Sequence, residues 1–202
     1  MITIIDLGIS NIKSITRGFI TQGFDVEIAS SSEEVEKSSS LVLPGVGAFP
    51  KAVETLKKMG LFKSIVDHAA KGKPLLGVCL GMQLLFTDSD EHTKTQGLDI
   101  IPGHVMQFPA DRQVPHMGWN EVVQHQKCTL FQGIPDRSDF YFVHSYYGVP
   151  DQKNDVVAST DYYSRFACAV QRENVYGVQF HPEKSQKLGL LLLCNFAMMT
   201  EY

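Results

Sequence analysis

The sequence has little of several features that mark common functional classes. Its four cysteines, at positions 79, 128, 168 and 194, show no CxxC spacing, so we expect free thiols rather than disulfides or a zinc site. It has no block of basic residues, and its net charge is -4, from 18 basic and 22 acidic side chains, which argues against nucleic acid as a partner. Glycine-rich phosphate-binding fingerprints and histidines at metal-ligand spacing are also missing, so we expect no metal and no cofactor.

Long hydrophobic runs are missing as well. The N-terminus, MITIIDLG, has no basic region and too short an apolar run for a signal peptide, and LGLLLLCNFAMM at 188–199 is shorter than a bilayer span. We therefore expect a cytoplasmic protein that does not enter a membrane. The chain has 202 residues, of which 44% are hydrophobic, and it contains no linker or repeat, so we expect a single domain over 1–202.

The order of apolar patterns predicts a mixed α/β fold. In the first half, strand-like runs at 1–6, 24–29, 40–44 and 74–79 alternate with helical runs at 10–23 and 51–72, which is typical of βαβ units on a parallel sheet. Ser10 is a candidate N-cap of the first helix. In the second half, HVMQF, EVVQH, FYFVHSYYG, DVVAST, FACAVQ and VYGVQF predict closely spaced strands of an antiparallel or mixed portion. A helix from about Lys187 to Met199 closes the chain, and 87–97 is interpreted as a surface loop.

The stretch GVCLGMQLLF at 77–86 places a cysteine at the junction between a predicted strand and a helix. The pattern G-x-C-x-G has the form of a nucleophile elbow, in which small flanking residues allow a tight turn that lifts the central side chain away from the sheet. Backbone N–H groups at the start of the helix favour the thiolate of Cys79. The pattern is short, and a buried structural cysteine between two chance glycines is an equal alternative on this motif alone.

A second stretch, YGVQFHPEKSQ at 176–186, supplies the groups that a thiol nucleophile needs. A base must take the thiol proton, and a third group must orient the base. His181 and Glu183 project to one side of an extended segment, which Pro182 favours, so the carboxylate can hold one ring nitrogen while the other faces Cys79. Alone, HPE on a loop is more often turn chemistry; together with the elbow it indicates a catalytic triad.

At these residues the sequence resembles a known family. GVCLGMQ and GVQFHPE are similar to the motifs of the triad-type class I glutamine amidotransferases, whose cysteine forms a thioester with glutamine and releases ammonia. Within that family, LPGVGAF, VPHMGWN, YFVHSYY and GVQFHPEKSQ resemble the glutaminase subunits of imidazole glycerol phosphate synthases, from the first strand to the last helix. The resemblance implies a three-layer α/β/α, flavodoxin-like domain with a central mixed, mostly parallel sheet.

The resemblance also implies roles for the matching residues. Cys79, His181 and Glu183 correspond to the triad. Attack on the amide places negative charge on its oxygen, and preorganised hydrogen-bond donors are the usual way to stabilise that oxyanion. The resemblance implies that the backbone N–H groups of Leu80 and of the Gly45–Val46 turn are these donors. Substrate glutamine would be held by a further set of residues: Gly47, Gln83, Glu91, His144, Ser145 and Tyr146.

A partner is expected because free ammonia becomes ammonium in water and is then no nucleophile, so it must travel through a sheltered path. The resemblance implies a heterodimer with a (β/α)₈-barrel cyclase, which makes imidazole glycerol phosphate and aminoimidazole carboxamide ribotide in histidine biosynthesis. The residues that match the docking face are Asn11, Ser14, His116, Trp119, Asn120 and Lys184.

Three alternatives remain open at this stage. A paralogous glutaminase could feed a partner that amidates a nucleotide sugar, since acceptor specificity lies in the partner. The chain could instead be a catalytically silent binding subunit on the same fold. It could also be a cysteine hydrolase of peptides or thioesters, which would leave YFVHSYY and VPHMGWN without a role.

Overall fold

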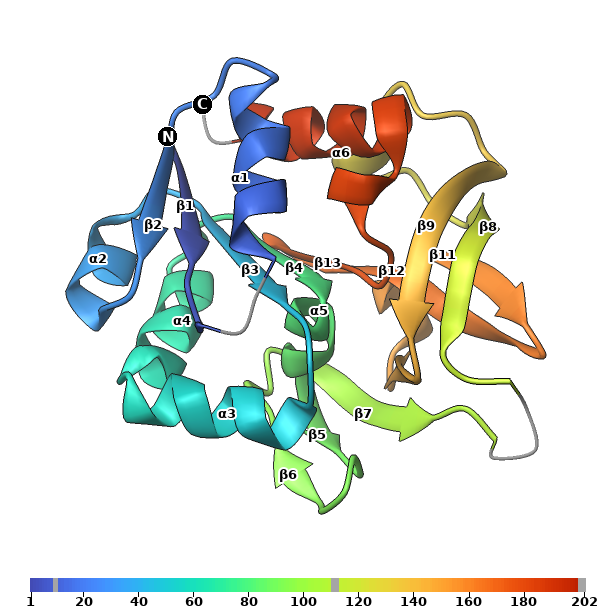
Figure 1. Ribbon diagram of the computed structural model, residues 1–202, viewed down its shortest axis with the longest axis horizontal. Helices are drawn as coiled ribbons and strands as arrows, with labels where there is room; N and C mark the ends of the chain where they lie inside the picture. Colours follow the sequence, from blue (N-terminus) through green and yellow to red (C-terminus); the bar gives the residue numbers. More distant parts are fainter. Residues whose placement is uncertain (9–10, 110–112, 200–202) are drawn as a thin grey trace.

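The computed structural model describes residues 1–8, 11–109 and 113–199. The chain alternates strands and helices as far as β4 and is dominated by strands afterwards (Figure 1). In chain order the elements are β1 (Ile2–Ile5), α1 (Ile12–Ile20), β2 (Val26–Ala29), α2 (Ser32–Lys37), β3 (Leu41–Gly45), α3 (Phe49–Lys58), α4 (Leu61–Ala70), β4 (Leu75–Cys79), α5 (Leu80–Leu84), β5 (Phe86–Ser89), β6 (Thr95–Gln96), β7 (Ile101–Gln107), β8 (His116–Gln124), β9 (Ser138–His144), β10 (Tyr146–Pro150), β11 (Val156–Tyr162), β12 (Ser164–Arg172), β13 (Val175–Val178) and α6 (Gln186–Met198), with short 3₁₀ turns at Thr129–Phe131, Lys153–Asp155 and Pro182–Lys184.

Within the described residues, nine strands form one mixed sheet in the order β2-β1-β3-β4-β13-β12-β11-β8-β9. The pairs from β2 to β13 are parallel, and those from β13 to β9 are antiparallel. β10, β7, β5 and β6 form a smaller sheet, again counted over the described residues. The predicted mixed α/β fold is confirmed, but among the described residues the sheet has four parallel and four antiparallel strand pairs, so it is not mostly parallel as the resemblance implied.

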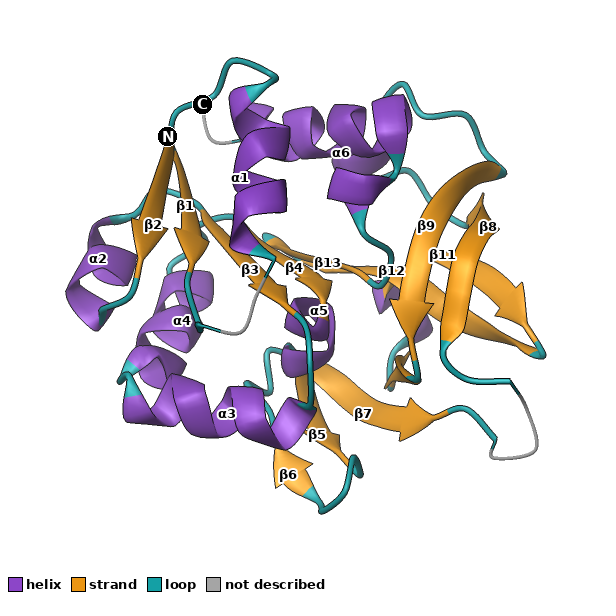
Figure 2. Cartoon of the chain, in the orientation of Figure 1, coloured by secondary structure: helices purple, strands orange, loops and turns teal. Residues whose placement is uncertain are grey.

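Helices lie on both faces of the parallel half of the sheet (Figure 2). Strand residues alternate between the two faces, so successive side chains of β3 enter different cores. Val42 packs with Ile15 and Phe19 of α1 and with α6. Its neighbours Leu41 and Leu43 pack on the other face with α3, α4 and α5. The sheet is therefore the middle of three layers, as expected.

Several local features differ from the sequence predictions. The helical run at 51–72 is two helices, because Gly60 adopts a left-handed φ of 69° between α3 and α4. Helix α2 was not predicted, although Ser31 and Glu34 form a capping box at its start. The segment 87–97 is not simply a surface loop, since it contains part of β5, β6 and the buried side chain of Glu91. The candidate cap Ser10 lies outside the described residues, and α1 begins at Ile12.

The predicted strand FYFVHSYYG is also divided. β9 ends at His144 and β10 begins at Tyr146, and the two strands belong to different sheets. The chain therefore turns a corner at Ser145. Aromatic residues lie on both sides of the corner, at 140–142 and 146–147, so the segment reads as one continuous strand in the sequence.

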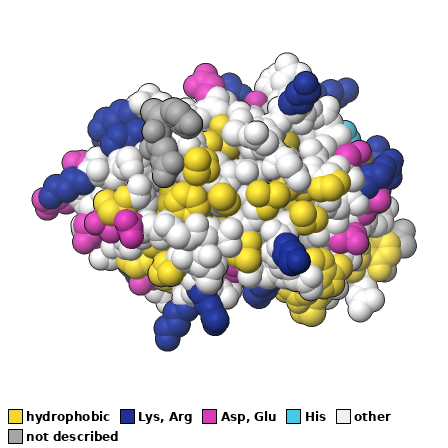
Figure 3. Space-filling model, turned by 90° about the horizontal axis from the view of Figure 1, so that it is seen from above, with side chains coloured by type: hydrophobic (Ala, Val, Ile, Leu, Met, Phe, Trp, Pro, Cys, Tyr) yellow, Lys and Arg dark blue, Asp and Glu magenta, His cyan; other side chains and the backbone are white. Residues whose placement is uncertain are grey.

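The face made by α1 and α6 carries apolar side chains across its middle, with charged residues toward its rim (Figure 3). Ile20 of α1 and Met198 of α6 are among the exposed large hydrophobic residues. Over the described part of the chain, no helix is long and apolar enough to cross a membrane.

We expect the fold to lose stability in acid partly through His68 of α4. Its ring is buried, with Nε2 3.2 Å from the Pro74 carbonyl, and burial lowers its pKa to about 4 from 6.5. Between pH 6.5 and 4 the unfolded chain binds more protons than the folded one, so stability falls as pH falls through that window. Denaturant unfolding at pH 7 and pH 4.5 should show a loss from His68 on the order of 1–3 kcal/mol. His68→Gln should reduce that loss, and an equal loss in both proteins would contradict the prediction.

Candidate active site

Cys79 lies at the sharp turn between β4 and α5. Its backbone has φ 56° and ψ -112°, a conformation that non-glycine residues rarely adopt and that typically persists only where the surroundings enforce it. Its side chain is buried, and Sγ lies 3.9 Å from the Val143 carbonyl oxygen and 3.7 Å from Gln179 Nε2. The strand, turn and helix of a nucleophile elbow are thus all present.

The two glycines of the elbow are needed because backbone segments approach each other there. A Cβ on Gly81 would overlap the carbonyl oxygen of Leu43 in β3, and a Cβ on Gly77 would lie 2.7 Å from the Gly81 carbonyl oxygen. Even a methyl group would push α5 away from the sheet. Small residues at 77 and 81 are therefore required by packing.

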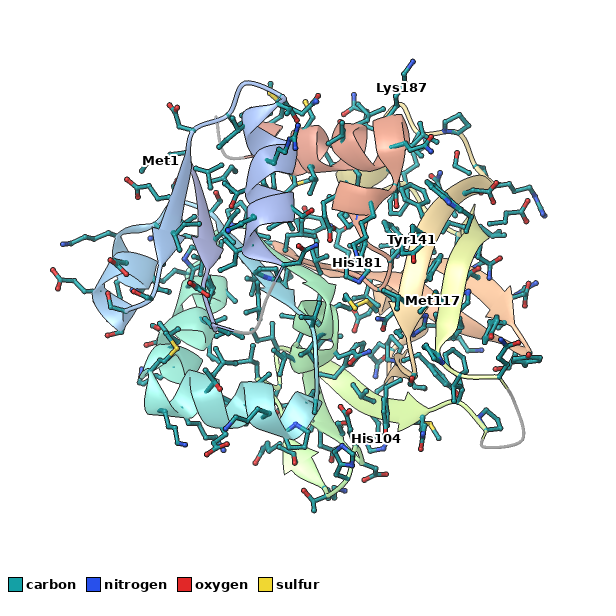
Figure 4. The ribbon with its side chains drawn as sticks, in the orientation of Figure 1. Met1, His104, Met117, Tyr141, His181 and Lys187 are labelled. Atoms are coloured by element: carbon teal, nitrogen blue, oxygen red, sulfur yellow. The ribbon has the colours of Figure 1, made fainter. Side chains whose placement is uncertain are left out.

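His181 and Glu183 form a buried pair directly after β13. His181 Nδ1 lies 2.8 Å from Glu183 Oε1, and both side chains are almost fully buried. Asn11 Nδ2 donates to the same carboxylate oxygen at 3.2 Å, which ties the start of α1 to the pair. Figure 4 shows His181 below the start of α6, near the carboxyl end of β4.

The proton affinity of His181 is set by its charged neighbours. Burial alone would lower its pKa, but its interactions with Cys79 and Glu183 outweigh burial and raise the pKa to about 10. Its Nε2 atom is buried and has no hydrogen-bond partner of normal geometry among the described residues. The imidazole therefore holds a proton at neutral pH whenever the sulfur is charged.

Cys79 and His181 line one cavity of about 290 Å³. This volume suits a ligand the size of a free amino acid. The predicted binding residues Gly47, Gln83, Glu91, His144, Ser145 and Tyr146 all line it as well, together with Val46, Leu80, Val143 and Lys184.

Glu91 reaches the cavity because the segment around it folds inward. Its Oε2 accepts a hydrogen bond from the Phe49 N–H at 2.7 Å, at the first residue of α3. Burial and the negative charge of Glu91 raise the pKa of Tyr146. The cavity therefore has an acidic group in its lining.

The candidate oxyanion residues lie on both sides of Cys79. Gly45 is paired with Cys79 in the register of β3 and β4, and Leu80 is the first residue of α5. Val46 is partly exposed at the cavity rim, and Gly47 has a left-handed φ of 98°. The structure thus brings together the 45–47 turn and the backbone that follows the nucleophile.

A buried amide network that the sequence did not reveal joins the cavity wall to the sulfur. Gln83 Nε2 donates to the Tyr146 carbonyl oxygen at 2.8 Å and to Gln179 Oε1 at 3.1 Å. Gln179 Nε2 in turn lies against Cys79 Sγ. Gln179 lies within the motif GVQFHPE, but only the tertiary structure shows which groups its side-chain amide contacts.

Two neutral histidines, one behind the other, support the carbonyl group of Tyr146 from another side. His144 Nδ1 lies 2.7 Å from the Tyr146 oxygen, and His144 Nε2 lies 2.9 Å from His116 Nδ1. Burial lowers the pKa of His144 to about 3 and that of His116 to about 4. Since the Tyr146 oxygen can only accept, His144 donates through Nδ1 and accepts from His116.

His116 requires a correction to the expected docking face. It is 3% exposed and stacked between Phe142 and Tyr162, so its side chain is not available to a partner. Asn120 is half-buried and donates to His116 Nε2 at 3.1 Å. Both residues face inward because positions 116, 118 and 120 share one side of β8.

The opposite side of β8 is exposed. Met117 is 62% and Trp119 48% exposed, and Trp119 packs edge-on against Tyr141 of β9. Lys184 is exposed, with Nζ 5.7 Å from the centre of the Tyr141 ring. We call Met117, Trp119, Tyr141 and Lys184 the rim surface; Met117 and Tyr141 are labelled in Figure 4. Of the other expected docking residues, Ser14 is half-buried on α1, and Asn11 contacts Glu183.

The fold and the site define a class of protein: an α/β protein with a cysteine nucleophile elbow and a buried His–Glu pair beside it. The model of the family "Glutamine amidotransferase class-I" matches residues 3–198. Imidazole glycerol phosphate synthase subunit HisH of Moorella thermoacetica is 46% identical over 201 residues, covering 100% of this chain and 96% of that protein. The HisH protein of Syntrophotalea carbinolica is also 46% identical, covering 98% of this chain and 100% of that protein.

Solved structures share the fold at lower identity. A structure titled PurLQS from Thermotoga maritima has a TM-score of 0.77 at 16% identity and covers 98% of this chain and 97% of its own. A glutamine amidotransferase from Thermotoga maritima has a TM-score of 0.72 at 17% identity, covering 100% of this chain and 98% of its own. The chain belongs to the class I glutamine amidotransferases and, within them, to the family of HisH subunits of imidazole glycerol phosphate synthases.

Gly81→Ala should disrupt the elbow, because its Cβ would collide with the backbone of β3. We expect a loss of about 3 kcal/mol or more in the free energy of unfolding, together with slower alkylation of Cys79. Gly60→Ala is the matched control: Gly60 also lies beside a helix start but has open space around its Cα, so only the left-handed strain of about 1–2 kcal/mol applies. Equal losses from the two substitutions would contradict the packing argument.

Proposed function

We propose that the chain is a single glutamine amidotransferase domain that acts in the cytoplasm as the glutaminase subunit of an imidazole glycerol phosphate synthase. It hydrolyses L-glutamine to glutamate and ammonia and passes the ammonia to a cyclase subunit in histidine biosynthesis. The observation that carries the proposal is that Cys79 and His181 meet in one cavity of amino-acid size, with Glu183 behind the imidazole.

The first half of the reaction forms a thioester. The Cys79 thiolate attacks the carboxamide carbon of glutamine, a C–S bond forms, and the carbonyl electron pair moves to oxygen. The backbone N–H groups of Leu80 and of the Gly45–Val46 turn flank the elbow and donate hydrogen bonds to this oxyanion. The raised pKa of His181 leaves it protonated, so it donates its proton to the departing nitrogen as the C–N bond breaks.

The second half regenerates the enzyme. Neutral His181 takes a proton from water, the oxygen attacks the thioester, and the C–S bond breaks with its electron pair returning to sulfur. Glu183 holds Nδ1 of the imidazole through both halves, so Nε2 stays directed to the reacting groups. Gln83, Glu91 and the backbone at 144–146 hold the amino and carboxylate groups of the substrate.

The partner is a cyclase subunit of the (β/α)₈-barrel type in a heterodimer. The names of the relatives, which are subunits, support a partner subunit, and the rim surface supports its location beside the cavity mouth. Tryptophan and tyrosine are enriched among energetic anchors at interfaces, and the exposed Trp119 packs against Tyr141 on the rim surface. Asn11 directly precedes α1 and donates a hydrogen bond to Glu183, so a partner that contacts the start of α1 also acts on the triad.

The direct test is glutamate production from glutamine by the purified chain and by the Cys79→Ala variant. We expect hydrolysis by the wild type and a loss of at least about a thousandfold in Cys79→Ala, because no other described residue that lines the cavity carries a thiol to form the thioester. Cys194→Ala removes a half-buried thiol from α6, away from the cavity, and should keep the activity. Normal hydrolysis by Cys79→Ala would refute the assignment of the nucleophile.

The rim surface is tested with Trp119→Ala. We expect the affinity for an imidazole glycerol phosphate cyclase to fall by about thirtyfold, because a buried interfacial tryptophan contributes about 2 kcal/mol or more, while Cys79 alkylation in the free chain stays unchanged. Ile28→Ala, on the exposed edge strand β2, is the control. If glutamate production by the wild type rises when the cyclase is added, the cyclase is the ammonia acceptor. If Trp119→Ala binds the cyclase as tightly as the wild type does, the interface lies elsewhere.

A further inference from the structure

The amide of Gln179 lies beside the reacting sulfur. Gln179 follows β13 directly and is fully buried, and its backbone N–H donates to the Cys168 carbonyl oxygen at 2.9 Å. Its Nε2 is 3.7 Å from Cys79 Sγ, a normal distance for a hydrogen bond to sulfur. Neither the triad nor the substrate-binding residues account for this amide.

The orientation of the amide follows from the network around it. The Tyr146 carbonyl oxygen can only accept, so Gln83 must direct its NH₂ group toward it. The same NH₂ group reaches Gln179, which must therefore present its oxygen to Gln83. The remaining side of the Gln179 amide faces the sulfur and carries N–H. A flipped Gln179 would bring two NH₂ groups together in a buried site, which costs a hydrogen bond.

We propose that Gln179 is a further catalytic residue, whose Nε2–H is a preset hydrogen-bond donor to the Cys79 sulfur. For the glutamine reaction, this inference rests on the proposed function. Negative charge resides on sulfur twice in the cycle: before the C–S bond forms and after it breaks. A hydrogen bond to a charged acceptor is stronger than one to a neutral acceptor, so the Gln179 donor favours thiolate over thiol and eases departure of sulfur from the thioester.

The network also fixes the distance between nucleophile and substrate pocket. Cys79, Gln179, Gln83 and the Tyr146 carbonyl group are joined by consecutive hydrogen bonds, and His144 holds the same carbonyl oxygen from the other side. Among the described residues, Gln83 Oε1 has no protein partner and remains available to a ligand in the cavity that Gln83 lines. The donor to sulfur and the wall of the pocket are therefore positioned together.

The test measures alkylation of Cys79 by iodoacetamide as a function of pH, followed by mass spectrometry of the full chain. Gln179→Glu keeps the size of the side chain and an acceptor for Gln83, but replaces the N–H at sulfur by a carboxylate oxygen. Gln179→Met removes both polar groups. Gln171→Met is the matched control, because Gln171 lies in β12 and its side chain donates to the Glu173 carbonyl oxygen, away from the cavity.

We expect the midpoint of the rate–pH curve to rise by about one pH unit in Gln179→Met, and further in Gln179→Glu, with no change in Gln171→Met. In glutamine hydrolysis, kcat should fall about ten- to hundredfold with little change in KM. A residue with a merely structural role would alter the unfolding midpoint and leave the alkylation curve in place. Gln179→Glu preserves the packing, so it decides the question if Gln179→Met does not fold.

An unchanged alkylation midpoint in folded Gln179→Glu would overturn the inference. Failure of the wild type to hydrolyse glutamine would refute the proposed function instead, and the alkylation comparison would still decide the role of Gln179. The two results are distinguishable because alkylation needs neither glutamine nor a partner subunit.

Discussion

The turn between β4 and α5 is the constraint on which the site depends. Cys79 occupies a rarely populated backbone conformation, and close packing of α5 against β3 keeps it there. That packing requires glycine at 77 and 81, and it is supported by the buried layers of hydrophobic side chains on both faces of the sheet. The fold thus stores local strain at the position where a thiol must be aimed into the cavity.

The mixed sheet explains why the groups needed for catalysis meet at this turn. In the parallel half, β3, β4 and β13 end side by side, which brings the 45–47 turn, Cys79 and His181 together. The antiparallel half and the smaller sheet contribute the opposite wall, through the corner at Ser145 between β9 and β10. The cavity lies where these two parts of the fold adjoin, so neither part could form it alone.

The buried polar side chains that surround the cavity form hydrogen bonds with one another. His116, His144, Gln83 and Gln179 all satisfy one another or the Tyr146 carbonyl group, in one consistent pattern of donors and acceptors. Buried networks of this kind rigidify a site when every member is paired. His181 Nε2 and Glu183 Oε2 are different: they are buried without a partner among the described residues, and they lie where the chemistry is proposed to occur.

Much of the fold and of the candidate site could be predicted from short sequence patterns, because their physical causes are local. The alternation of apolar runs indicated a mixed α/β fold, G-x-C-x-G indicated the elbow, and the spacing of His181 and Glu183 indicated their contact. Other features depended on residues far apart in the chain. The corner at Ser145, the burial of His116 and the contact of Gln179 with Cys79 came only from the tertiary structure. A repeating pattern reports which face of an element is apolar, whereas the partner that a buried polar group meets is decided by how distant strands pack together.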